Sequence, residues 1–150
     1  MKVRINKIDR ELLTRAVDIA AEGILKGGGP FGAVITKGGK IISEAYNEVV
    51  YSSDPTAHAE ILVLRKAGKV LGNYRLKDTV LYVTAEPCPM CVSAMVHGRI
   101  SRLVSTCTHG DAEWESSYHS RGDAHQPTRP APCSATQIGF DSAAGGCFYH

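Results

Sequence analysis

Two short motifs place the strongest constraint on how this chain can fold, because their side chains are suited to holding one metal ion together. The first is His58-Ala59-Glu60, and the second, after 26 intervening residues, is Pro87-Cys88-Pro89-Met90-Cys91. One imidazole and two thiolates suit a tetrahedral zinc ion, and three protein ligands leave its fourth position open, which is typical of a catalytic site. The fold must therefore bring two distant segments to one point.

The positions of these residues at expected helix starts agree with that requirement. Cys88 and Cys91 are three positions apart at the start of a helix, so both thiols can face the same point and the helix dipole favours their thiolate forms. Glu60 does not share a helix face with His58, so both reach one site only if the first turn of their helix meets it end-on. Asp54-Pro55-Thr56 supplies such a helix start. Glu60 can then act as a general acid and base toward a zinc-activated water.

Hydrophobic periodicity and turn residues predict alternating helices and strands. Helices are expected at 9–26, with Asp9 as the N-cap, and at 56–69 and 89–97; strands are expected at 31–37, 40–46, 79–85 and 100–106. Gly38-Gly39 is typical of a tight turn between two antiparallel strands. The strand, helix and strand of 79–106 predict a right-handed parallel crossover, so the fold class is α/β.

Six segments of the chain resemble the cytidine deaminase-like superfamily over about residues 8–106. The branch that they resemble most contains bacterial guanine deaminases and tRNA-specific adenosine deaminases. Two of the segments, Gly29–Val34 and Glu86–Cys91, are similar to the guanine enzymes, whereas Asn73–Leu76 and Leu81–Thr84 are similar to the tRNA enzymes. The other two segments are Asn47 and Asp54–Glu60.

This resemblance implies a three-layer α-β-α fold with a mixed central sheet, in which a parallel β-α-β unit surrounds the zinc site. It also implies a homodimer or a larger assembly, and hydrolytic deamination by a zinc-activated water with one Zn²⁺ per chain. By position, the metal ligands are His58, Cys88 and Cys91, the proton shuttle is Glu60, and the substrate contacts are Asn47 through its side chain, Ala59 through its backbone N–H and Phe31 as an aromatic lining of the pocket.

Charge favours a small purine substrate, guanine or a related aminopurine, over an adenosine in tRNA. The formal net charge is only +2, with +5 over residues 1–106 and −3 over residues 107–150. An enzyme acting on tRNA must also hold phosphates, which requires a larger basic excess. Two alternatives remain. One is a non-catalytic zinc-binding subunit of a heteromeric deaminase, which does not need Glu60; the other is a thiol-disulfide protein using Cys88 and Cys91, which leaves His58 and Glu60 unexplained.

The chain divides by composition near residue 106. Residues 1–106 are expected to form the catalytic domain, and residues 107–150, which contain no Leu, Val, Met or Lys, form an atypical tail without helical or strand periodicity. The tail is either a divergent lid of the same domain or the product of an altered reading frame. The sequence has no apolar run of about 18 residues and has charges near its N-terminus, so a cytoplasmic protein without membrane segments is expected.

Overall fold

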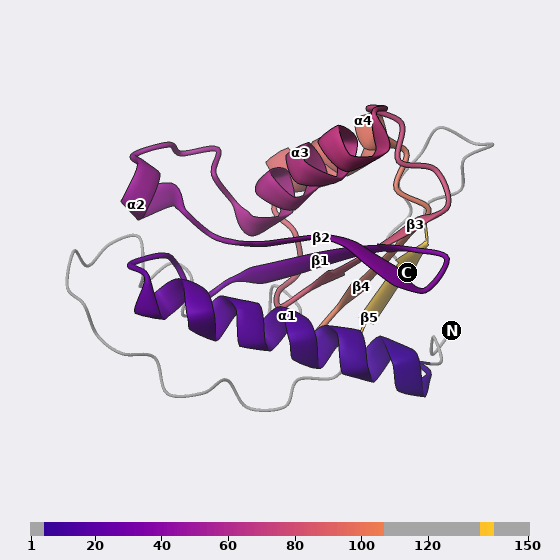
Figure 1. Cartoon of the computed structure of the whole chain (residues 1–150), viewed down its shortest axis with the longest axis horizontal. Coiled ribbons are helices and arrows are strands. Elements are labelled where there is room, and N and C mark those ends of the chain that lie inside the picture. Colours follow the sequence, from indigo (N-terminus) through magenta and orange to yellow (C-terminus); the bar gives the residue numbers. More distant parts are fainter. Residues whose placement is uncertain (1–4, 107–135, 140–150) are drawn as a thin grey trace.

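The computed structural model describes residues 5–106 and 136–139, in which one mixed sheet lies between helices on both of its faces (Figure 1). The helices are α1 (Lys7–Leu25), α2 (Val49–Ser52), α3 (Ala59–Leu71) and α4 (Pro89–Gly98), and the strands are β1 (Gly32–Lys37), β2 (Lys40–Tyr46), β3 (Thr79–Val83), β4 (Arg102–Ser105) and β5 (Thr136–Gly139). The strand order is β2-β1-β3-β4-β5, and only β3 and β4 are parallel among these neighbours. The predicted three-layer α/β fold and its parallel crossover are confirmed.

Each face of the sheet has its own apolar core. Helix α1 covers one face and packs against alternate strand residues, whereas α3 and α4 cover the other face (Figure 1). The first core contains Leu12, Leu13, Ala16, Ile19, Val34, Tyr82 and Val104, and the second includes Ala33, Ile35, Val63, Leu81, Val83, Met95 and Leu103. Burial on both faces explains why the central strands are nearly continuous apolar runs in the sequence.

Helix α1 begins before the position predicted from the sequence. Its N-cap is Asn6, whose Oδ1 accepts a hydrogen bond from the Asp9 N–H at 2.8 Å, while Asp9 Oδ2 accepts one from the Asn6 N–H at 3.1 Å. These two bonds form a capping box. The prediction that Asp9 is the N-cap is therefore wrong, because Asp9 takes the third helical position of the box.

Helix α3 begins later than predicted, at Ala59 and not at Thr56. Asp54 Oδ1 accepts hydrogen bonds from the Thr56 N–H at 2.8 Å and from the Thr56 hydroxyl at 2.7 Å, which holds the preceding residues in a turn. His58 is the N-cap, with an extended backbone (ψ 150°). The turn thus places His58 at the start of α3, as is required if the first turn of this helix is to meet the metal site end-on.

Two short elements have no counterpart among the predictions. Helix α2 has only four residues and no buried side chain, so it leaves no apolar periodicity. Strand β5 extends the sheet by pairing antiparallel with β4, so the expectation that the tail contains no strand is wrong for Thr136–Gly139. The predictions for the remainder of the tail, including the lid and the reading frame, lie outside the described residues.

Among the helices of the described part of the chain, none has both the length and the apolar character needed to cross a membrane.

A buried charge network joins α1 to the two parallel strands. The Asp9 side chain is 1% exposed and accepts hydrogen bonds from both terminal nitrogens of Arg102, each at 2.9 Å, and from the Tyr82 hydroxyl at 3.0 Å. Burial by itself raises the pKa of Asp9, but the hydrogen bonds from Arg102, the Asn6 N–H and Tyr82, with the Arg102 charge, outweigh it and lower the pKa below 3.8. Burial and Asp9 in turn raise the pKa of Tyr82 to about 12.

We expect Asp9→Asn to lower the free energy of unfolding at pH 7 by about 3 kcal/mol, because it removes the buried carboxylate that accepts two hydrogen bonds from the Arg102 guanidinium. Since the pKa of Asp9 is lower in the folded than in the unfolded chain, this stabilisation is complete above the unfolded value and is lost as pH falls below about 4. Urea unfolding from pH 2 to pH 7 tests this, with the exposed Asp18→Asn as control. A constant difference between wild type and Asp9→Asn across that range would contradict it.

Candidate metal centre

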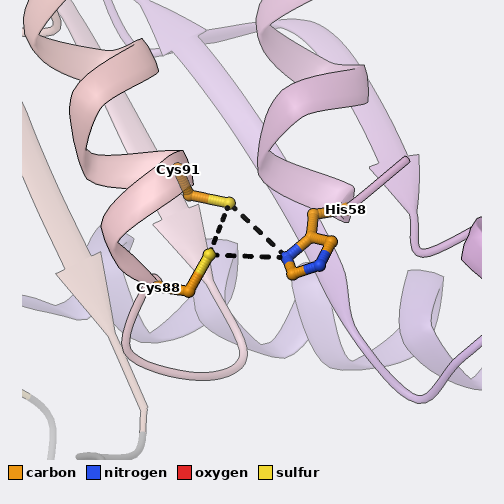
Figure 2. A group of neighbouring side chains, drawn as sticks. All are labelled: His58, Cys88 and Cys91. Atoms are coloured by element: carbon orange, nitrogen blue, oxygen red, sulfur yellow. Dashed lines mark hydrogen bonds between the residues drawn. The ribbon is translucent and has the colours of Figure 1, made fainter. Parts of the chain in front are cut away.

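Three potential ligands from two helix starts lie together on the α3 and α4 side of the sheet. His58 is the N-cap of α3, Cys88 is the N-cap of α4, and Cys91 lies in the first turn of α4. Their side chains point toward one another, as Figure 2 shows. The two sulfurs are 3.6 Å apart, and His58 Nδ1 lies 3.7 Å from Cys88 Sγ and 3.6 Å from Cys91 Sγ. The sequence prediction that these three residues come together is confirmed.

The spacing of this triad fits a tetrahedral zinc ion. With zinc–sulfur bonds of about 2.3 Å and zinc–nitrogen bonds of about 2.0 Å, tetrahedral ligands place two sulfurs about 3.8 Å apart and a sulfur and a nitrogen about 3.5 Å apart. All three separations in the triad lie within about 0.2 Å of these values. One imidazole and two sulfurs are also the ligand types that zinc prefers. The residues present therefore fit the metal.

The local electrostatics of the triad come from the two helices. The side chains of His58 and Cys88 form no capping hydrogen bond to their helices, and Pro89 occupies the first helical position of α4. The partial positive charges of both helix N-termini consequently lie at the triad, where they stabilise thiolates.

Burial opposes this effect at Cys91. The side chain is fully buried, and burial raises the pKa of its thiol above the ordinary value, with the negative charge of Glu60 and the neighbouring Cys88 adding to the increase. A bound cation reverses this balance, because a coordinating thiol is deprotonated outright. The site is therefore suited to a divalent ion that compensates its negative charge.

Glu60 is the second residue of α3 and is 9% exposed. Its negative charge helps to raise the pKa of the Cys91 thiol, which places the Glu60 carboxyl group beside that member of the triad. Glu60 thus lies in the first turn of α3 next to one member of the triad, and its role as proton shuttle stays a prediction. A carboxylate in this position can exchange protons with a molecule bound at the triad.

Asn47 is held in one orientation by its neighbours. Its backbone N–H donates to the Phe31 carbonyl at 3.0 Å, and its carbonyl accepts from the Gly29 N–H at 2.9 Å. Its side-chain Oδ1 accepts from the Val49 N–H at 3.1 Å, and the residue is buried. Because Oδ1 already accepts a hydrogen bond from Val49, the amide N–H groups of Asn47 are the atoms placed to donate hydrogen bonds to a ligand.

The other two predicted substrate contacts lie on the same side of the sheet. Phe31 directly precedes β1, is half-buried and packs against the core under α3 and α4. Ala59 is buried and is the first residue of α3, so its backbone N–H has no acceptor within the helix. The substrate contacts that the resemblance implies for Phe31 and Ala59 stay predictions.

The sequence assigned no role to Thr84, which links three segments where the strands end. Its hydroxyl oxygen accepts a hydrogen bond from the Gly32 N–H at 3.1 Å, and its carbonyl accepts one from the Thr106 hydroxyl at 2.6 Å. Thr84 therefore fixes the start of β1, just after Phe31, against the segment that leads from β3 to Cys88. Its place at the carboxyl end of a buried parallel strand was the signal that could have identified it.

The family with the cytidine and deoxycytidylate deaminase zinc-binding region matches residues 6–107. This range includes the whole triad and Glu60, so the prediction of zinc as the cofactor is confirmed.

Individual relatives divide between two activities. Guanine deaminase of Bacillus subtilis (strain 168) is 54% identical over 101 residues, which are 67% of this chain and 65% of that protein. The tRNA-specific adenosine deaminase of Haemophilus influenzae is 45% identical over 104 residues, 69% of this chain and 60% of that protein. The chain thus spans less than two thirds of the length of either relative. An X-ray structure of guanine deaminase from Bacillus subtilis superposes with a TM-score of 0.69 at 44% identity, covering 85% of this chain and 83% of that one.

Proposed function

From the premise that the chain belongs to the family with the cytidine and deoxycytidylate deaminase zinc-binding region, we propose that it is a zinc-dependent hydrolase that deaminates a purine base, with guanine as the preferred substrate. The observation that carries this proposal is the Glu60 carboxyl group beside Cys91, which forms a candidate metal triad with His58 and Cys88. A site that only stabilised the fold would need no such carboxylate, which speaks against a non-catalytic subunit.

The proposed reaction converts guanine and water to xanthine and ammonia, and Glu60 carries the protons. A zinc ion held by the triad would act as a Lewis acid that lowers the pKa of water to near neutrality. The Glu60 carboxylate accepts a proton from the attacking water and donates it to a ring nitrogen of the base. Glu60 then accepts the remaining proton of the added hydroxyl group and delivers it to the departing amino group, so that the C–N bond breaks, a carbonyl forms and ammonia, not amide, leaves.

Asn47, Ala59 and Phe31 are proposed to position the base. The amide N–H groups of Asn47 are donors, so they suit an acceptor on the ring, such as a carbonyl oxygen or an unprotonated nitrogen. The Ala59 N–H offers a further donor at the start of α3. The Phe31 ring provides an apolar surface for the planar base.

An adenosine in tRNA is the second candidate substrate, because relatives named tRNA-specific adenosine deaminase are 42–48% identical to this chain over the matched residues. The higher identity to a guanine deaminase and the small net charge of +2 favour the free base. A tRNA substrate requires the protein to neutralise several phosphates.

A homodimer in the cytoplasm is the proposed state of the protein. Helix α4 supports association through Val96, an apolar side chain that is 38% exposed on the outer side of the helix. A second copy of the chain would cover this side chain.

We expect the zinc-loaded chain to release ammonia from guanine, and to release at least about tenfold less from adenine, cytosine or guanosine, because a site that hydrogen-bonds its substrate discriminates strongly against analogues that leave those groups unpaired. Activity on guanine should change little between 50 and 200 mM salt, since no phosphate is held. A coupled ammonia assay measures both.

An anticodon stem-loop that carries adenosine at the wobble position is the comparison substrate in the same assay. Ammonia release from this RNA alone, decreasing steeply with salt, would replace guanine with tRNA as the substrate. Zinc binding without ammonia release from any of these substrates would favour the non-catalytic subunit.

A further inference from the structure

The two cysteines of the triad are also placed to form a disulfide bond with each other. They flank Pro89 and Met90 at the N-terminus of α4, and their sulfurs are already 3.6 Å apart. A disulfide requires a sulfur separation of about 2.0 Å and Cα atoms about 4.4–6.8 Å apart, which residues three positions apart at a helix start satisfy. Closing the bond therefore needs rotation of two side chains and no change of fold.

The two thiols differ in exposure in a way that sets an order of reaction. Cys88 is partly exposed, whereas Cys91 is fully buried behind it. An oxidant from solvent reaches Cys88 first, and Cys91 lies next to it as the thiol that resolves the oxidised sulfur. A partly exposed cysteine beside a resolving cysteine is the arrangement of reversible redox sites.

We propose that Cys88 and Cys91 form a reversible disulfide in the metal-free chain, and that this modification decides whether the chain can take up zinc. A peroxide oxidises the Cys88 thiol to a sulfenic acid and leaves as water. The Cys91 sulfur then attacks the Cys88 sulfur, the S–S bond forms and a second water departs. Two thiols together lose two electrons and two protons, and the peroxide is reduced to two waters.

The disulfide and the zinc site exclude each other. Both sulfurs are ligands of the triad, so closing the bond leaves only His58 to hold the ion. Conversely, a bound ion occupies both sulfurs and protects them from oxidation. The inference rests on the triad alone and does not depend on which base, if any, the chain deaminates.

The test uses the full chain with Cys107, Cys133 and Cys147 replaced by serine, so that only the triad thiols remain. We expect hydrogen peroxide to convert the chelator-treated protein to a species lighter by two hydrogens, with Cys88 joined to Cys91 in its peptide map. Zinc affinity, measured by competition with a coloured chelator, should fall by more than about 100-fold and recover with dithiothreitol. Zinc-loaded protein should lose its thiols at least about tenfold more slowly, since both sulfurs are bound.

Two controls make the result decisive. In the background with Cys107, Cys133 and Cys147 replaced by serine, oxidation of Cys91→Ser should stop at a sulfenic acid on Cys88. If that triple-serine background fails to fold, the wild-type chain should still give the peptide in which Cys88 is joined to Cys91. Free thiols after peroxide, oxidation of Cys88 and Cys91 to separate sulfinic acids, or full zinc uptake by the disulfide form would overturn the inference. Because ammonia release is not a readout here, failure of this inference is distinguishable from failure of the proposed function.

Discussion

Glu60→Gln is expected to lower kcat for ammonia release by about 10³-fold or more, while zinc content stays at one ion per chain. Glutamine keeps the size and polarity of the side chain but cannot accept and return a proton, and general acid-base catalysis typically contributes about 10²–10⁴-fold. The effect should be near the upper end because the same carboxyl group serves several proton transfers. Steady-state kinetics with guanine, together with metal analysis of the same samples, measures both quantities.

Glu11→Gln is the matched control for this variant. Glu11 lies exposed on α1, on the opposite side of the sheet from the triad, so its loss should leave kcat unchanged (Figure 1). If Glu60→Gln retained activity within tenfold of wild type, a different group would have to carry the protons and the proposed mechanism would be wrong.

Cys91→Ala is expected to weaken zinc binding by about 10³-fold, because one of three protein ligands is lost from a site whose total binding free energy is of order 10 kcal/mol. Cys91 is fully buried and packs within the core under α3 and α4, so the thermal stability of the chain should also fall. Competition with a chelator of known affinity gives the binding constant, and the same samples give the loss of ammonia release.

Ser93→Ala tests the specificity of that effect, since Ser93 is exposed on the same helix and is not part of the triad. Wild-type zinc affinity in Cys91→Ala would mean that the metal is held elsewhere. Unchanged affinity in Ser93→Ala together with loss in Cys91→Ala assigns the ion to the triad.

The triad could be predicted from the sequence because its chemistry is local. His58 and Glu60 are two positions apart in one motif, Cys88 and Cys91 are three apart in the other, and each pair lies beside a recognisable helix start. Ligand types and spacing then determine the metal and the open position. The two-sided burial of the central strands was equally readable, since it leaves continuous apolar runs.

Exact element boundaries could not be predicted, because side-chain hydrogen bonds decide them. The reciprocal hydrogen bonds between Asn6 and Asp9 start α1 at Lys7, before its apolar periodicity begins. The hydrogen bonds from Thr56 to Asp54 hold the chain in a turn, so α3 begins only at Ala59. The orientation of Asn47 depends on contacts with Phe31 and Gly29, which lie far from it in the sequence. Strand β5 has four residues, too few for alternation to be visible.

Because the triad lies at two helix starts, the free energy of unfolding depends on the concentration of free zinc. A polar N-cap side chain typically contributes about 1 kcal/mol to a helix, yet at α3 and α4 those positions hold ligands that form no cap. Zinc binds only the folded arrangement, so stability rises with the concentration of free metal. Destabilising substitutions anywhere in the domain should consequently be tolerated best in zinc-replete cells. When zinc is scarce, the same substitutions should cause the chain to unfold.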